Sequence, residues 1–227
     1  MELLPGIHRV EGVSSNVFLL VEDDGMAVID TGLPGNGPKI VDYIRAIGRR
    51  PEEVRLILLT HQHVDHVGGA AELARLTQAE VAAHPLDTPA IEGKGPRELP
   101  KPVLMRAAFR ALMVSRLRPV SVSHALADGE VLQVLAADGG LRVIASPGHT
   151  TGHVSFYLPG RRALFAGDAY VHRGDAIMPS PAIFSTDVPE MLRSLRALSQ
   201  LDVEASFPGH GRPIMDGAGA RIAEVMR

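Results

Sequence analysis

The stretch LLTHQHVDHVGG at residues 58–69 decides the fold that we expect for this chain. The apolar run directly before it predicts a β-strand. Because side chains alternate along a strand, His61 and His63 point to one side. The turn into the next predicted helix brings Asp65 and His66 to a neighbouring point. Four side chains that can ligate a metal therefore lie within six residues, between a strand and a helix.

This cluster is chemically costly unless it holds a metal ion. Its three imidazoles would repel one another when protonated, and its polar groups would need partners if they were buried. Neutral imidazole and carboxylate are the forms that coordinate a cation, so a metal removes the conflict. The chain contains no cysteine, and any metal site must therefore use nitrogen and oxygen ligands.

Three later segments each carry one further potential ligand after a β-like run. His149 lies in SPGHTTGH, Asp168 ends ALFAGD, and His210 lies in ASFPGHG. A glycine next to each ligand lets the backbone approach a cluster closely. We therefore expect these three side chains to reach the same rim as the first four.

The rest of the sequence alternates predicted strands with predicted helices. Apolar patterns predict strands at residues 16–21, 26–29, 54–59, 131–135, 141–145, 153–158 and 163–165. Helical periodicity predicts helices at residues 37–47, 67–78, 102–117, 188–199 and 219–226. Hairpin strands followed by alternating strands and helices indicate sheets packed on each other with helices outside.

Segment 86–124 departs from this pattern. It is rich in proline and then carries an apolar stripe at helical spacing, formed by Met105, Phe109, Leu112 and Met113. Two interpretations stay open, a helix packed on the core and a cap that covers the substrate. As a cap, the stripe would give an acyl chain an apolar wall.

Length and composition indicate one soluble domain spanning residues 1–227, with the insertion inside it. The 227 residues are 45% hydrophobic and 22% charged, which excludes a disordered chain. The net charge of -3 argues against the basic surface that nucleic acid requires. The first residues, MELLPGIHRV, lack a basic leader, and no apolar run is long enough to span a bilayer. We therefore expect a cytoplasmic protein with neither nucleic-acid nor membrane partners.

The motifs together resemble those of the metallo-β-lactamase-fold hydrolases. The resemblance rests on HxHxDH at 61–66, PGHTTGH at 147–153, GD at 167–168 and PGHG at 208–211, in that order across nearly the whole chain. It implies an α/β (α+β) fold, a four-layer αβ/βα sandwich of two packed mixed sheets flanked by helices. It also implies two divalent metal ions, with ligands His61, His63 and His149 for one, Asp65, His66 and His210 for the other, and Asp168 as the bridge.

Zinc is the metal that we expect, although iron, manganese and cobalt suit the same ligands. Asp30, in VIDTG, resembles the family's supporting acid, which holds ligand loops or fixes a histidine tautomer. Capping a turn is the alternative for Asp30. His153 is expected to stabilise the turn around His149.

A dinuclear centre implies that a hydroxide shared by the two metals is the nucleophile. Asp65 is expected to orient the water or to accept its proton. Tyr170 follows the bridging acid by two positions, as a tyrosine often does in lactonases of this fold, and would contact a carbonyl or leaving group. A buried structural role is its alternative. His172 and Arg173 are candidates for a polar leaving group, with exposed surface positions as the alternative.

The predicted function is a metal-dependent hydrolase of an ester, lactone or thioester bond. The alternatives within enzymes are an iron-dependent persulfide dioxygenase and a hydroxyacylglutathione hydrolase of the glyoxalase II type. The alternative from another class is a module that holds metal without turnover. The expected partner is a small-molecule substrate with an apolar portion, and a homodimer is one option for the assembly.

Overall fold

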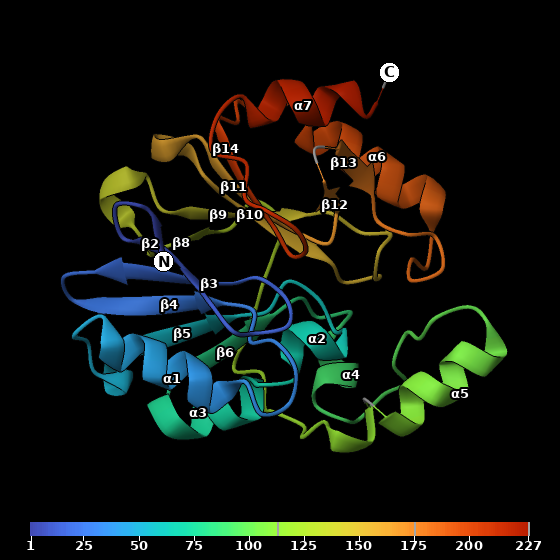
Figure 1. Cartoon of the computed structure of the whole chain (residues 1–227), viewed down its shortest axis with the longest axis horizontal. Coiled ribbons are helices and arrows are strands. Elements are labelled where there is room, and N and C mark those ends of the chain that lie inside the picture. Colours follow the sequence, from blue (N-terminus) through green and yellow to red (C-terminus); the bar gives the residue numbers. More distant parts are fainter. Residues whose placement is uncertain (113, 175, 227) are drawn as a thin grey trace.

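Two mixed β-sheets pack face to face in the computed structural model, which describes residues 1–112, 114–174 and 176–226 (Figure 1). The first sheet has the order β1 (Glu2–Leu4), β2 (Ile7–Val10), β3 (Val17–Glu22), β4 (Gly25–Ile29), β5 (Val54–Leu58), β6 (Glu80–Ala83) and β7 (His124–Ala125). The second has the order β14 (Ala205–Pro208), β11 (Ala163–Gly167), β10 (Val154–Leu158), β9 (Leu141–Ala145) and β8 (Val131–Leu132). A separate hairpin joins β12 (Tyr170–Arg173) and β13 (Ala176–Pro179).

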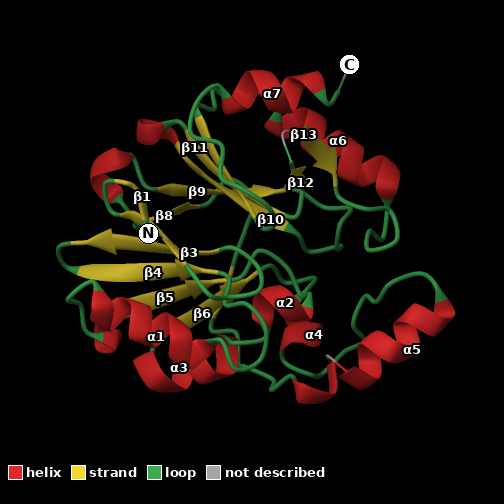
Figure 2. Ribbon diagram, viewed as in Figure 1, coloured by secondary structure: helices red, strands yellow, loops and turns green. Residues whose placement is uncertain are grey.

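Helices cover the outer face of each sheet, as Figure 2 shows. The helices α1 (Gly37–Ala46) and α3 (Ala70–Thr77) share a hydrophobic core with the first sheet, whereas α6 (Val188–Leu198) and α7 (Ala218–Glu224) share one with the second. Parallel neighbours such as β4, β5 and β6 need crossover connections, which α1 and α3 provide. The predicted four-layer αβ/βα sandwich is therefore confirmed.

The central core lies between the two sheets and contains four buried phenylalanines, three of which form a cluster of neighbouring rings. Phe18 comes from the first sheet, and Phe165 and Phe207 come from the second. The ring centroids of Phe165 and Phe207 are 4.9 Å apart, and Phe18 lies 5.5 Å and 5.4 Å from them. Aromatic rings at these distances bury a large apolar area, so this trio holds the sheets at a fixed separation.

The helix predicted for residues 67–78 is shorter than expected and corresponds to α3, and a separate short helix, α2 (Val64–Val67), precedes it. Gly68 and Gly69 lie between them. A Cβ on Gly68 would lie 2.4 Å from the backbone nitrogen of Pro34, and one on Gly69 would lie 2.5 Å from the carbonyl oxygen of Thr31. Only glycine allows this close packing of the ligand segment against the loop after β4.

Segment 86–124 contains α4 (Thr88–Ile91), α5 (Val103–Leu112) and a 3₁₀ helix (Val114–Arg116). The predicted helix at 102–117 is thus shorter than expected. Helix α5 lies at the edge of the molecule beyond α4 (Figure 1). Leu104 is 85% exposed and Met105 is 41% exposed, so this part of α5 does not pack on the core. Among the described helices, none combines the length and apolar character needed to cross a bilayer.

We predict that Phe165→Ala destabilises the fold by about 3–5 kcal/mol, because it removes one ring of the trio and leaves a cavity between the sheets. Urea unfolding monitored by circular dichroism measures this change. The exposed substitution Leu86→Ala is the control and should change the free energy of unfolding by less than about 0.5 kcal/mol. Equal effects of the two substitutions would contradict the prediction.

Candidate metal centre

The seven predicted ligands meet at one edge of the sandwich, where several strands end. His61, His63, Asp65 and His66 follow β5 of the first sheet. His149 lies in the turn between β9 and β10, Asp168 follows β11, and His210 follows β14, all in the second sheet. The site is therefore assembled from loops of both sheets, as the motif order indicates.

Three histidines form the first donor group. His61 Nε2 lies 3.1 Å from His63 Nδ1, and His63 Nδ1 lies 2.9 Å from His149 Nε2. Nitrogen ligands of a tetrahedral zinc ion lie about 3.3 Å apart, since each Zn–N bond is about 2.0–2.1 Å. The three nitrogens thus converge on one point at nearly the spacing that a metal requires.

The second donor group contains Asp65, His66 and His210. His210 Nε2 lies 3.3 Å from His66 Nε2 and 3.1 Å from Asp65 Oδ2. Asp65 Oδ2 lies 3.9 Å from His66 Nε2. The two donor groups correspond to the two ligand sets that the family resemblance implies, and in each set the donor atoms lie within 4.8 Å of one another.

Asp168 lies between the two groups. Its Oδ1 is 3.5 Å from His66 Nε2, and its Oδ2 is 3.5 Å from both His149 Nε2 and His210 Nε2. The buried Oδ1 has no hydrogen-bond partner among the described residues. A buried carboxylate oxygen without a donor is costly, whereas a cation would satisfy it. The residues at this edge therefore fit a metal ion.

The first group is held in its neutral, ligating form. Burial, followed by the charges of neighbouring imidazoles, keeps the pKa of His61 and of His149 well below its usual value. Burial also lowers the pKa of His63 to about 4. Neutral imidazole offers a lone pair, so these three side chains need lose no proton to bind a cation near neutral pH.

The second group is different because carboxylates surround its histidines. Burial alone would lower the pKa of His66, but Asp168, Asp30 and Asp65 outweigh it and raise that pKa to about 10. The pKa of His210 is also raised, since Asp168 and Asp65 outweigh its burial. A proton on His66 thus balances these carboxylates in the metal-free protein, and a bound cation would replace it.

Asp30 orients one ligand from behind. Its Oδ2 lies 2.8 Å from His66 Nδ1 and accepts a hydrogen bond from the Thr60 hydroxyl at 2.8 Å. Its Oδ1 accepts from the Thr60 backbone amide at 2.9 Å. Asp30 adopts a φ of 60°, a left-handed conformation that aspartate tolerates better than most residues. The carboxylate thereby directs His66 Nε2 toward the donor group.

His153 supports the bridging acid as well as its own turn. Its Nδ1 donates to the Ser146 carbonyl oxygen at 3.0 Å, and its Nε2 accepts the Asp168 amide at 2.9 Å. Burial lowers the pKa of His153 to about 3, which keeps the acceptor nitrogen free of a proton.

Asp87 is a supporting residue that the sequence motifs do not reveal. It is fully buried and accepts three hydrogen bonds, from the Gln62 backbone amide at 2.8 Å, the Thr150 hydroxyl at 2.7 Å and the Gly152 backbone amide at 2.9 Å. Gln62 separates two ligands of the first motif, and Thr150 follows His149. Asp87 thus joins two ligand loops across the sandwich. A single aspartate in HPLD carries no pattern that would have indicated this role.

A pocket of about 290 Å³ opens beside the donors. Half of its lining residues belong to the donor set, namely His63, Asp65, His149, Asp168 and His210. The other half are Pro100, Val171, Ser180, Pro181 and Phe184. The pocket therefore has a polar floor formed by the donors and largely apolar walls.

The structure places Tyr170 away from this pocket. Tyr170 is fully buried in the core under α6 and α7, and its hydroxyl bonds to Ser206 Oγ. Because neighbouring side chains alternate along β12, Val171 faces the pocket while Tyr170 and His172 face the other side. His172 Nδ1 donates to the Arg212 carbonyl oxygen at 2.7 Å. Tyr170 thus has the buried structural position that is the alternative to substrate contact.

The two remaining candidates whose side chains are described, Arg173 and Met105, do not line the pocket either. Arg173 is exposed at the end of β12, and Met105 is exposed on α5. Met113 and the side chains of Phe109 and Leu112 lie outside the described residues. The cap role of segment 86–124 stays a prediction, and Pro100 is its contribution to the pocket wall.

Comparison with known proteins agrees with this arrangement. A model of the metallo-beta-lactamase superfamily matches residues 10–210. A probable metallo-hydrolase of Bacillus subtilis is 28% identical, over 94% of this chain and 86% of that protein. A hydroxyacylglutathione hydrolase of Cereibacter sphaeroides is 32% identical, over 87% of this chain and 63% of that protein. The solved structure of a metallo-beta-lactamase family protein from Thermus thermophilus has a TM-score of 0.76 at 27% identity, over 99% of this chain and 79% of that one.

We predict that Gly209→Ala lowers zinc affinity by about tenfold or more while the protein stays folded. The added Cβ would lie 2.3 Å from Asp168 Oδ1 and 2.7 Å from His66 Cε1, so it must displace donors. Competition with a chromogenic chelator measures the affinity. Gly25→Ala is the matched control, because the atoms nearest to its Cβ belong to the side chain of Arg55, which can move. Unchanged affinity in Gly209→Ala would argue against this geometry.

Metal binding should release protons and tighten as the pH rises from about 7 to 9. The pKa of His66 is raised to about 10, so in the metal-free protein this imidazole keeps its proton, and its charge stabilises the fold until the pH rises through that value. A cation must displace that proton. Calorimetric zinc titrations in two buffers of different ionisation enthalpy count the protons released. Binding without proton release would refute the charge assignment.

Proposed function

This chain belongs to the metallo-β-lactamase superfamily, and we propose from its site that it is a dinuclear metal-dependent hydrolase of a carboxylic ester, lactone or thioester. The observation that carries the proposal is the pair of donor groups on either side of Asp168, whose buried Oδ1 lacks a donor among the described residues. His61, His63 and His149 would hold one ion, Asp65, His66 and His210 the other, and Asp168 would contact both. Zinc is the ion that we propose.

Held by these residues, two divalent ions would supply a Lewis acid for the scissile carbonyl and would lower the pKa of bound water toward 7. The protein contributes the rest. Asp65 lines the pocket. Burial alone would raise its pKa, but the charges of His66 and His210 outweigh this effect, so the pKa of Asp65 falls well below its usual range. Asp65 is therefore ionised near neutral pH and can accept a hydrogen bond from the attacking water. This hydrogen bond would orient a lone pair of the water oxygen toward the substrate.

The pocket walls favour an acyl substrate with an apolar portion. Pro100, Val171, Pro181 and Phe184 offer no charge to a substrate, and they would shield the reacting carbonyl from bulk water. The similarity to a protein named hydroxyacylglutathione hydrolase favours a thioester within this group. The chain spans 63% of the length of that relative, and a shared thioester substrate is therefore part of the proposal.

The proposal is tested with the zinc-loaded protein on a panel of esters, lactones, thioesters and phosphodiesters. We expect hydrolysis of at least one acyl class and its loss on treatment with a chelator. Asp168→Ala and His61→Ala should lose metal and turnover together, with circular dichroism unchanged. His84→Ala, which removes a histidine outside the donor set, is the matched control and should keep both.

Other outcomes identify the alternatives. Undiminished hydrolysis by metal-free protein would reject the proposal. One iron per chain together with oxygen uptake on glutathione persulfide would identify a persulfide dioxygenase. Stoichiometric metal without turnover on any substrate would identify a metal-holding module.

A further inference from the structure

One polar side chain of the pocket has no role in the donor set. Ser180 lines the pocket and is 3% exposed. Its Oγ is buried and has no hydrogen-bond partner among the described residues, a property that it shares there only with the oxygen of Asp168. Because buried hydroxyls nearly always find a partner, an unpartnered one at a binding pocket indicates a missing ligand atom.

The backbone around Ser180 is held in place. Pro179, the last residue of β13, precedes it, and Pro181 follows it. Proline fixes its own φ and restricts the residue before it. The Phe184 amide and the Ser185 hydroxyl both donate to the Pro181 carbonyl oxygen, at 2.9 Å and 3.1 Å. The backbone of Ser180 is therefore fixed in the pocket wall, and its hydroxyl can move only by rotation about its own side-chain bond.

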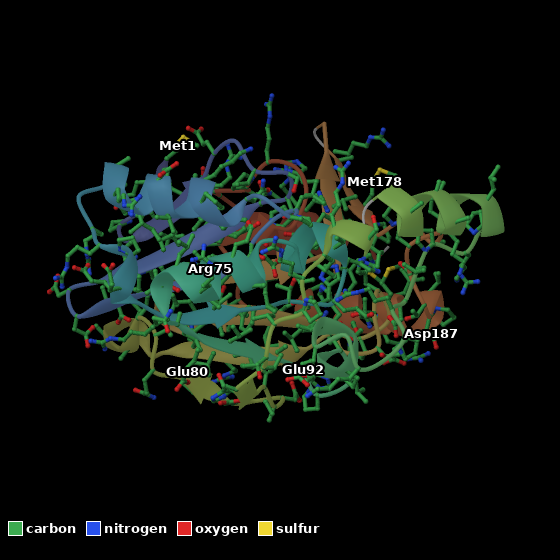
Figure 3. All side chains as sticks on the ribbon, turned by 90° about the horizontal axis from the view of Figure 1, so that it is seen from below. Met1, Arg75, Glu80, Glu92, Met178 and Asp187 are labelled. Carbon is green, nitrogen blue, oxygen red and sulfur yellow. The ribbon has the colours of Figure 1, made fainter. Side chains whose placement is uncertain are left out.

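The turn that carries Ser180 also packs on a metal donor. The Thr186 amide donates to the His149 carbonyl oxygen at 3.2 Å, and Ser185 Oγ lies 3.5 Å from His149 Nδ1. Met178 and Asp187, on either side of this turn, lie toward the end of the molecule that carries α5 (Figure 3). Ser180 and His149 therefore line the same pocket on segments that contact each other.

Size and polarity define what the pocket accepts. Its volume of about 290 Å³ lies at the small end of ligand sites, which span about 300–1,000 Å³. Outside the donor set, the described lining residues other than Ser180 have apolar side chains. The pocket therefore suits a short group that is mostly apolar and carries one hydrogen-bonding atom.

We propose that Ser180 is a specificity-determining residue whose hydroxyl donates a hydrogen bond to an oxygen substituent on the substrate's acyl group. The inference rests on the proposed function and narrows its substrates to esters or thioesters of short acyl groups bearing a hydroxyl, ether or keto oxygen. A plain alkyl group of equal size leaves the Ser180 hydroxyl unpartnered, and the pocket discriminates against it for that reason. Tyr170 cannot make this contact, because its hydroxyl bonds to Ser206 in the core.

Two hydroxamic acids of matched shape test this contact without any turnover. Methoxyacetohydroxamic acid and butyrohydroxamic acid differ by one oxygen in place of a CH₂ group, and both can bind a metal ion. Calorimetry gives the Kd of each for the zinc-loaded wild type and for Ser180→Ala. The preference for the methoxy compound should fall by about three- to tenfold in the variant, the loss expected for one hydrogen bond.

Two controls separate recognition from a structural effect. Ser199→Ala removes a hydroxyl that bonds to the Arg196 carbonyl oxygen outside the pocket, and it should leave the preference unchanged. Ser180→Ala removes an unpartnered buried hydroxyl, so its unfolding midpoint should equal or exceed that of the wild type. A merely structural Ser180 would show a lower midpoint instead.

Equal preferences in the wild type and Ser180→Ala would overturn the inference, as would the failure of both hydroxamates to bind. Hydrolysis of methoxyacetyl and butyryl thioesters is measured separately. Absence of hydrolysis of these thioesters and of the whole acyl panel, together with the expected change in hydroxamate preference, would reject the proposed function but not the hydrogen bond of Ser180 to a bound ligand.

Discussion

The gathering of three carboxylates, two of them buried, around one buried imidazole is the constraint on which the site depends. Asp30, Asp65 and Asp168 all act on His66, and they raise its pKa to about 10 despite its burial. Such a concentration of negative charge away from water needs a positive partner. A proton on His66 is the least that the fold can supply, and a divalent cation supplies more. The same charges that make the metal-free site costly therefore make it a selective receptor for a cation.

The ligands keep their positions because other buried groups hold the loops between them. Asp30 fixes the ring of His66, and His153 holds the backbone amide of Asp168. Asp87 joins the loop after β5 to the loop that contains His149. None of these side chains belongs to the proposed donor set, yet each fixes an angle or a spacing on which coordination depends. The two metal-donor groups are thus one hydrogen-bonded unit.

The sequence predicts the donors better than it predicts the pocket. His61 to His66 are specified by local spacing after a strand, and the four-layer fold brings His149, Asp168 and His210 to the same edge. Tyr170 is a candidate by its distance from Asp168 along the chain, but alternation along β12 turns it into the core. Ser180 and Asp87 reach the site through long-range packing, which no local motif encodes. Short motifs therefore predict chemistry, whereas selectivity comes from tertiary structure.

The donors come from loops of both sheets, and this origin has a mechanical consequence. A cation bound at that edge would tie one half of the sandwich to the other, so the distance between the halves would set the spacing of the proposed ligands. The trio of Phe18, Phe165 and Phe207 sets that distance from the interior. Substitutions in the interior, far from the donors, can therefore change the spacing between the two donor groups by fractions of an ångström without replacing any donor residue.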